Sequence, residues 1–340
     1  MLSNKFKVNY SVGAVANGVK TDTFTFFLLF FYSNIIGLNP GLAGLAIFIA
    51  LCIDAITDPL MGTISDRTNS SFGRRHPYMF ISFIPMSLGY ILLFAPRQEW
   101  DMSQTDLFIW MTIFTVITRI GMTLFDIPHR AFGGEVTKDY KERTILMSWR
   151  EMFAWVAGLS NAFLGYGVFF ASTPEFPQGQ LNPDVWFPFA LTGAAIMVFS
   201  VLYSSLSTKD EINSLSKWSG AISLKDIFNE LKIAIGNKSF LIFFFGNLFL
   251  SLAWGLSNSL TLFVNTYFWE FEATQIKYFL PIYLFGTLFA FYLTPRMVNV
   301  LEKRNIVLIS ISVVGLLSPA AFISVSYTHL RAHETDLHLV

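Results

Sequence analysis

The chain has 340 residues, of which 53% are hydrophobic and 14% are charged, and its formal net charge is zero. Soluble domains carry about 25% charged residues, so this composition is typical of a membrane protein that has the lipid bilayer as its partner. The neutral balance gives no indication of nucleic-acid binding, and the single Cys52 cannot form an internal disulfide.

Nine apolar segments are long enough to cross a bilayer, which takes about 20 residues. They are 10–36, 41–64, 77–95, 106–132, 144–171, 185–206, 240–268, 273–295 and 306–325. The pattern predicts an all-α, polytopic membrane protein. Lys and Arg gather in the loops on one side, whereas the loops on the other side hold only Arg97 and Lys277. By the positive-inside rule, the N-terminus is expected to be cytoplasmic, in the cytoplasmic (inner) membrane.

The longest loop, 207–239, divides the chain after the sixth span. Its apolar residues recur at helical spacing, which predicts an amphipathic helix on the cytoplasmic surface. These residues are Leu224, Ile227, Phe228, Leu231 and Ile235. We therefore expect a six-helix bundle at 1–206, a linker at 207–239 and the first three helices of a second bundle at 240–325, the layout of two-halved transporters.

The end of the chain, 326–340, differs from the rest and holds three of the five histidines: His329, His333 and His338. It has no span pattern. We interpret it as non-native, adapter-like sequence, and expect the authentic chain to diverge near Val325 and to continue through about three more spans. An ordinary polar tail or a His-rich metal segment are the alternatives.

We single out nine charged side chains within the predicted spans. They are Lys20, Asp22, Asp54, Asp58, Arg119, Asp126, Arg130, Arg150 and Glu151. Such residues usually face a cavity or an ion path because a charge in lipid is costly. Arg130 follows Asp126 by one helical turn, so this pair is also expected to form a local salt bridge. Glu151 is expected to pair with a neighbour in the helix bundle.

Asp54 and Asp58 are four residues apart and lie on one face of their predicted helix. They repel each other, and their span holds no Lys or Arg, so we expect a proton or a cation to neutralise them. Pro59 removes the hydrogen-bond partner of the Ala55 carbonyl. With the Thr57 hydroxyl, these oxygens would suit a hard monovalent cation or a proton. The alternative is a kinked helix whose aspartates bind distant arginines.

Three stretches carry a resemblance to a known family: "GLAGLAIFIALCIDAITDPLMGTISDRTNSSFGRRHP", "FDIPHRAFGGEVTKDYKERT" and "SWREMFAWVAG". With them, most of residues 7–325 resembles the glycoside–pentoside–hexuronide:cation symporters, which have the major facilitator fold of about twelve helices. The resemblance implies a secondary active transporter and not an enzyme. It would move a sugar, glycoside or uronide by alternating access. Na⁺, Li⁺ or H⁺ would be the coupling cation, without another cofactor or an obligate protein partner.

The resemblance also implies roles for individual residues. Asp54 and Asp58 match the cation-binding aspartates, Thr123 assists the cation, and Asp126 joins the cation and sugar sites. Arg150 matches the arginine that binds sugar hydroxyls. Two departures concern the sugar. Gly18 stands where the family has a sugar-binding aspartate, for which Asp22 is the expected substitute, and Arg130 replaces a tryptophan that would stack on a sugar. An α-galactoside therefore fits poorly, whereas a substrate with a carboxylate would suit the additional arginines.

The loop after the second span matches the family's gating loop. Its predicted gating residues are Gly62, Asp66, Arg67, Gly73, Arg74 and Arg75.

Three other functions are alternatives to sugar transport. A cation-coupled carrier of a lysolipid or another amphiphile is the main alternative, because related folds move such cargo. Membrane prenyltransferases also use an Asp-x3-Asp motif, to bind Mg²⁺–diphosphate. They need a second Asp-rich motif, and the later loops offer only Asp210-Glu211 and Glu270-x-Glu272. An intramembrane aspartyl protease would need different sequence contexts around its two aspartates.

Overall fold

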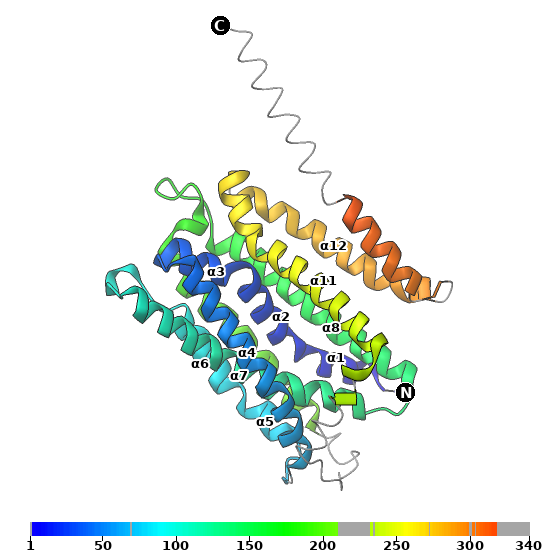
Figure 1. Cartoon of the computed structure of the whole chain (residues 1–340). Helices are drawn as coiled ribbons and strands as arrows, with labels where there is room; N and C mark the ends of the chain where they lie inside the picture. The colour runs from blue at the N-terminus through cyan, green and yellow to red at the C-terminus, as the bar shows by residue number, and fades with distance from the viewer. Residues whose placement is uncertain are drawn as a thin grey trace. The chain divides into compact units, whose positions relative to one another are not determined.

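The computed structural model describes residues 2–68, 70–209, 232–233, 235–271, 273–298, 301–302 and 304–317. These residues form helices and connecting loops, with no strand among them (Figure 1). The predicted all-α membrane fold is therefore confirmed. Six helices are long and apolar enough to cross a membrane: Pro40–Arg67, His76–Leu93, Gln104–Glu135, Glu142–Phe169, Pro183–Ser207 and Lys238–Phe268. They correspond to the second to seventh predicted spans. The shorter apolar helices Pro281–Leu293 and Arg304–Leu317 overlap the eighth and ninth.

The first predicted span is one helical run made of several segments. These are α1 (Asn4–Val12), α2 (Ala14–Asp22), η1 (Thr23–Phe27), α3 (Leu28–Phe30) and η2 (Phe31–Ile36). The run begins earlier than expected, because the Ser3 hydroxyl accepts a hydrogen bond from the Phe6 amide at 3.1 Å and caps α1. It ends at Gly37, whose φ of 85° suits a residue without a Cβ.

The second to sixth spans follow in order. They are α4 (Pro40–Arg67), the pair α5 (His76–Ile81) and α6 (Phe83–Leu93), α7 (Gln104–Glu135), α8 (Tyr140–Leu164) continued by η4 (Gly165–Phe169), and α9 (Trp186–Ser207). Local signals set their starts. Asn39 caps α4 by accepting from the Gly41 amide at 2.8 Å, and Ser103 with Asp106 forms a capping box at α7.

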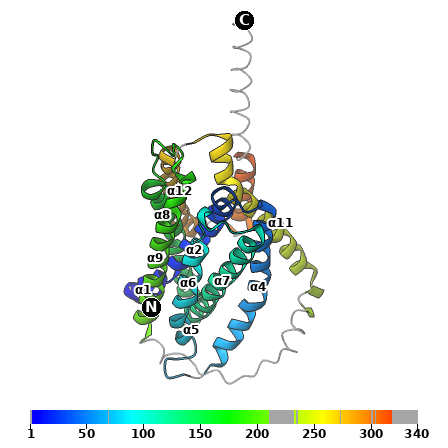
Figure 2. The same cartoon turned by 90° about the vertical axis from the view of Figure 1, so that its left-hand side faces the viewer.

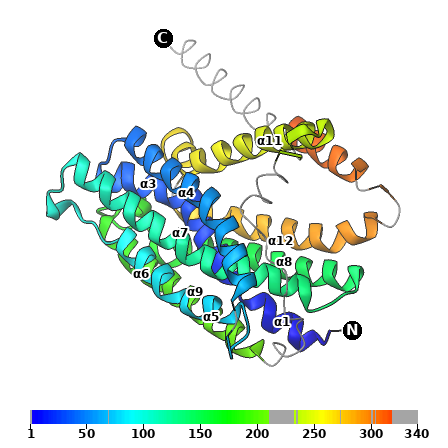
Figure 3. The same cartoon turned by 60° about the horizontal axis from the view of Figure 1, so that its bottom comes forward.

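The helices pack so that charged residues of neighbouring spans meet. Helix α7 lies between α4 and α6, while α2 packs against α8 and α9 (Figure 2, Figure 3). Glycines allow the closest approaches. A Cβ at Gly18 would lie 2.0 Å from the Ala154 carbonyl oxygen of α8, and one at Gly121 would lie 2.4 Å from the Met86 nitrogen of α6. Small residues at such contacts are the usual means of packing membrane helices tightly.

The chain forms two compact units, Met1–Leu284 and Phe285–Val340. In the first unit, α11 (Lys238–Phe263) and η8 (Val264–Phe268) contact the first span: the Tyr267 hydroxyl donates to Asn34 Oδ1 at 2.6 Å. In the second unit, the Arg296 guanidinium of α12 (Ala273–Val298) lies 3.5 Å from the centre of the Tyr292 ring. The predicted linker helix falls almost entirely outside the described residues, and the tail 326–340 falls wholly outside them, so the boundaries at 207, 240 and 326 stay predictions.

Candidate functional site

Asp54 of α4 forms an ion pair with Arg119 of α7, in which Arg119 Nη1 donates to Asp54 Oδ2. Both side chains are largely buried, at 21% and 12% exposure. The sequence predicts a proton or a cation as the neutralising charge, because the aspartates' own span holds no Lys or Arg. At Asp54, Arg119 supplies a compensating charge from 65 positions away along the chain. The alternative of an aspartate bound to a distant arginine holds at this position.

Asp58 has a different environment one turn further along α4. Thr123 Oγ1 of α7 donates to Asp58 Oδ1 at 2.7 Å, and no ion pair to Asp58 is found within the described ranges. Asp54 Oδ1 is buried and has no hydrogen-bond partner in the described part of the chain. The Thr57 hydroxyl turns back to the Asp54 carbonyl at 3.5 Å. The helix pair thus presents carboxylate oxygens in a setting that suits a small cation or a proton.

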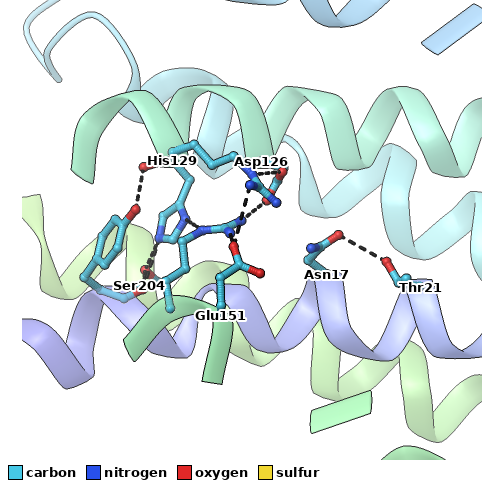
Figure 4. A network of polar contacts seen from close by, with 9 residues as sticks. Asn17, Thr21, Asp126, His129, Glu151 and Ser204 are labelled. Carbon is cyan, nitrogen blue, oxygen red and sulfur yellow. Dashed lines mark hydrogen bonds and ion pairs between the residues drawn. The ribbon is translucent and has the colours of Figure 1, made fainter. Parts of the chain in front are cut away.

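A second charged cluster joins α7 and α8 (Figure 4). The Arg150 side chain is fully buried and donates to Asp126 Oδ1 and, at 2.5 Å, to Glu151 Oε1. Arg130 Nε donates to Asp126 Oδ2 at 2.6 Å, and Arg130 Nη1 lies 3.6 Å from Glu151 Oε1. Two carboxylates and two guanidinium groups therefore close a ring without net charge. The predicted salt bridge between Arg130 and Asp126 and the expected pairing of Glu151 are both present.

His129 completes this cluster, although the sequence analysis did not single it out. Its ring stacks on Tyr10 at 4.2 Å and on Phe125 at 4.8 Å between centroids. Its Nε2 lies 3.0 Å from the Tyr10 carbonyl oxygen, and Arg150 Nε donates to Nδ1 at 3.4 Å. Since a carbonyl only accepts, Nε2 carries the proton and Nδ1 accepts, so His129 is neutral. A histidine directly after Pro128 in an apolar span was the available signal.

The structure does not bring Gly18 and Asp22 together with Asp126 and Arg150. Gly18 lies at the close contact of α2 with α8, where even a methyl group meets the Ala154 carbonyl. Asp22 is 7% exposed and accepts a hydrogen bond from Asn161 at 3.4 Å. Gly18 thus has a clear packing role, and Asp22 belongs to a separate buried polar group.

Lys20 of α2 is a further charged residue near the aspartate pair of α4. Its ammonium group is 5.7 Å from the centre of the Phe24 ring, and the Arg119 guanidinium is 5.6 Å from the same ring. Asp54, Asp58 and Asp126 are within electrostatic reach of Lys20. In the described part of the chain Lys20 forms no ion pair, so it adds a positive charge beside the carboxylates.

The predicted gating loop forms an ion-pair network with the end of α7. Arg75 donates to Asp66 at 2.6 Å and to Glu135 at 2.8 Å, and Arg74 also donates to Glu135. Gly73 has a φ of 74°, a backbone conformation that glycine adopts without strain. Of the other predicted residues, Gly62 is a position where a Cβ would lie 3.7 Å from Ile127 Cγ2, an ordinary contact distance, and Arg67 is exposed. Glu135, which the sequence analysis did not name, connects both arginines.

A pocket of about 450 Å³ lies elsewhere in the first unit. It is lined by Glu175, Phe176, Pro177, Gln178, Leu181, Thr266, Tyr267 and Glu270. None of these residues belongs to the charged clusters, so the pocket is separate from them.

Comparison with known proteins identifies the family. A model of the family described as MFS/sugar transport protein matches residues 9–337, which is most of the chain. The chain belongs to this family. The match and the names of the relatives indicate a transporter and not an enzyme, so the prenyltransferase and protease alternatives are excluded.

Three relatives illustrate the range of the family. The uncharacterized symporter YnaJ of Bacillus subtilis is 28% identical over 92% of the chain and 65% of its own length. The putative glycoside/cation symporter YagG of Escherichia coli is 27% identical over 71% of the chain and 50% of its length. The sodium-dependent lysophosphatidylcholine symporter 1-A of Danio rerio is 29% identical over 49% of the chain and 31% of its length. The chain thus spans less than two thirds of each of these relatives.

Proposed function

We propose that this protein is a cation-coupled symporter that moves a sugar, glycoside or uronide across the cytoplasmic membrane by alternating access. The match to the MFS/sugar transport family over residues 9–337 carries the proposal. Similarity to a putative glycoside/cation symporter supports the kind of cargo. The N-terminus is proposed to be cytoplasmic because the basic residues gather in the loops on that side.

The coupling cation is proposed to bind between α4 and α7. Thr123 donates to Asp58 at 2.7 Å, and no ion pair among the described residues includes Asp58. Asp54 Oδ1 is buried and has no hydrogen-bond partner in the described part of the chain. Na⁺, Li⁺ and H⁺ all suit carboxylate and hydroxyl oxygens, so the site does not select among them by chemistry alone. Arg119 keeps the second oxygen of Asp54 occupied, which leaves Asp58 as the principal ligand. The Thr57 hydroxyl supplements these ligands after a rotation away from the Asp54 carbonyl.

The cargo is proposed to bind at Asp126 and Arg150. A guanidinium group offers a planar fork of donors that matches vicinal hydroxyls or a carboxylate, and the carboxylate of Asp126 accepts from sugar hydroxyls. In the structure the two side chains bond to each other. A bound sugar would therefore replace these bonds by bonds to its own hydroxyls. Asp22 and Gly18, which the resemblance suggested as further ligands, are not part of this proposal.

The network of Asp66, Arg74, Arg75 and Glu135 is proposed to act as the cytoplasmic gate. It ties the end of α4 and the following loop to the end of α7 through ion pairs of 2.6 and 2.8 Å. The Arg75 side chain is only 4% exposed, whereas Asp66 and Glu135 are 42% and 33% exposed, so water reaches these ion pairs from the carboxylate side. Such a network can therefore open and close during each transport cycle.

Uptake into liposomes that contain the purified protein tests the proposal. Radiolabelled glycosides and uronides are supplied with an inward Na⁺ gradient or an inward H⁺ gradient, and an ionophore then collapses the gradient. We expect gradient-dependent accumulation that Asp58→Asn abolishes. Glu99→Gln, which removes an exposed carboxylate from a loop, is the matched control and is expected to accumulate normally. If neither gradient drives accumulation of any sugar derivative, the proposed function is incorrect.

Transport of a lysolipid remains the second candidate, because half of the chain is similar to a lysophosphatidylcholine symporter. The same liposomes can be assayed with a labelled lysophosphatidylcholine and a sodium gradient. Sodium-driven movement of the lipid, in the absence of any sugar uptake, would favour this candidate.

A further inference from the structure

A buried polar group lies apart from the charged clusters, around Asp22 at the end of α2. Asp22 is 7% exposed, Thr23 is fully buried and Asn161 of α8 is 2% exposed. Asn161 Nδ2 lies 3.4 Å from Asp22 Oδ2 and 3.2 Å from Thr23 Oγ1. The Tyr90 hydroxyl of α6 donates to Thr23 Oγ1 at 2.8 Å. Three helices thus contribute polar side chains to a site that water scarcely reaches.

Among the residues that the structure describes, no positively charged side chain pairs with Asp22. None of the ion pairs among the described residues includes it, in contrast to Asp54, Asp126 and Glu151, which all pair with arginines. The titratable groups that interact with Asp22 are Tyr90 of α6 and Tyr166 of η4.

The helices that pack against this end of the first span add no charge beside it. Helix α9 and the residues of α11 after Lys238 contain no charged side chain. The charged residues of α7 belong to the clusters described above, apart from the exposed Asp106, which forms the capping box at the start of the helix. On the first span itself, Lys20 lies over the Phe24 ring and interacts with the carboxylates of that separate site.

The position of Asp22 along the helices separates it from the proposed cargo site. Its Cβ would lie 3.3 Å from a Cβ on Gly158, which follows Arg150 by eight residues on α8. At 1.5 Å of rise per residue, this is about 12 Å along the helix axis. Asp22 therefore neither neutralises Arg150 nor competes for the same contacts.

Asn161 suits either protonation state of this carboxyl group. Its Nδ2 can donate to an ionised carboxylate, and it lies 3.4 Å from Asp22 Oδ2. Its Oδ1 is buried and has no hydrogen-bond partner in the described part of the chain. A half-turn of the amide brings this oxygen to the carboxyl group, where it can accept an O–H proton. The site thus holds a spare acceptor beside a carboxyl group without a counter-ion.

We propose that Asp22 is a proton-binding site. In this buried group its carboxyl group is protonated and neutral, with the proton taken up from solvent, and Asn161 accepts the hydrogen bond of the acid's O–H. A proton is the ligand that fits, because a neutral acid needs no counter-ion in a site without positive charge. The site is separate from the aspartate pair proposed for the coupling cation, and the inference does not depend on which cargo is moved.

Infrared spectroscopy of the purified protein in liposomes tests this proposal directly. A protonated carboxylic acid has a C=O band clear of the bands of ionised carboxylates and peptide groups. At neutral pH, the difference spectrum between wild type and Asp22→Asn should show the loss of one such band. Asp106→Asn, which changes an exposed carboxylate at the start of α7, should lose a carboxylate band instead. Loss of a carboxylate band in Asp22→Asn would overturn the proposal.

A second variant keeps the proposal testable if Asp22→Asn does not fold. Asn161→Leu removes the acceptor of the acid's O–H and leaves Asp22 in place. Because a C=O group in a weaker hydrogen-bond environment absorbs at higher frequency, the acid band should shift upward in this variant. An acid band that does not change in Asn161→Leu would overturn the assignment of Asn161 as the acceptor of the acid's O–H.

Transport assays need not succeed for either spectrum to be informative. Where uptake is measurable, Asp22→Asn should retain cargo affinity within about twofold of wild type, because the amide mimics a protonated acid and makes no direct contact with the cargo. A fall in cargo affinity of tenfold or more would instead identify Asp22 as a cargo ligand.

Discussion

Asp54 and Asp58 should respond differently to the same substitution, although they lie one turn apart on α4. Asp54→Asn removes the partner of Arg119, whose side chain is only 12% exposed. Breaking a fully buried ion pair costs about 3–5 kcal/mol because the remaining charge is uncompensated. Because Asp54 is 21% exposed, part of this cost is screened by water. We therefore expect the free energy of unfolding to fall by about 2–3 kcal/mol, below the range for a fully buried pair.

Asp58→Asn should leave stability nearly unchanged. The amide keeps an oxygen that can accept the bond that Thr123 donates at 2.7 Å. A neutral hydrogen bond contributes about 0.5–1.5 kcal/mol and is retained, so a loss of less than about 1 kcal/mol is expected. The lost charge should instead weaken cation binding. A unit charge about 4 Å away contributes about 4 kcal/mol at an effective dielectric constant of 20. Solvent exposure reduces this energy, so a loss of about tenfold to a thousandfold in cation affinity is expected.

Two measurements separate these effects. Unfolding in a graded mixture of denaturing and mild detergent gives the stability of each variant relative to wild type. Substrate counterflow and cation-driven accumulation are then measured in the same liposomes. Counterflow exchanges cargo for cargo without net cation movement, so Asp58→Asn should retain counterflow and lose accumulation. The reasoning fails if Asp54→Asn is as stable as wild type, or if Asp58→Asn accumulates cargo normally.

Three further substitutions follow from individual contacts. Arg150→Lys keeps the charge but loses the donor fork that reaches Asp126 and Glu151. Cargo affinity should therefore fall at least about tenfold, that is by about 1.4 kcal/mol. Unchanged affinity in an uptake assay would show that the cargo binds elsewhere. Gly18→Ala should reduce the yield of folded protein in size-exclusion chromatography, because the new Cβ would lie 2.0 Å from a backbone oxygen of α8. Gly134→Ala is the control and should behave as wild type, because its Cβ would meet no described atom within 4 Å beyond its own helix backbone and chain neighbours. Glu135→Gln should lower the transport rate severalfold without changing cargo affinity, because it weakens the ion pairs of the gating loop; equal losses in both would argue against a gating role.

The helical architecture could be predicted from the sequence because the signal is long and local. About 20 apolar residues between basic or polar loops leave a bilayer-spanning helix as the main solution, since lipid offers no partners for backbone N–H and C=O groups. The ends of the helices were less predictable. The first span begins at Asn4 because of a cap at Ser3, a contact of a few atoms that does not change the hydropathy pattern.

For the charged clusters, the sequence predicts most of the members and the pairs within one helix, but not the pairs between helices. Arg130 and Asp126 are one turn apart on one helix, so their salt bridge follows from spacing. The pair of Asp54 and Arg119 joins two helices, and its existence depends on how α4 and α7 are rotated about their axes. Gly18 is a second position whose role the sequence alone does not decide. A glycine in a span can mark either a missing side chain at a binding site or a close helix contact. Only the distance to α8 distinguishes the two.

Helix α7 offers a physical route by which a bound cation could affect the cargo. Arg119, Thr123, Asp126 and Arg130 follow one another at spacings of four, three and four residues, and therefore form one stripe along the helix. The first two contact the aspartates of α4, and the last two belong to the ring of charges with Arg150 of α8. A cation that draws Thr123 and Asp58 together acts on the same rigid helix that carries Asp126, one turn away. Under the proposed function, each ligand would then favour the same position of α7, and by linkage each would raise the affinity of the other.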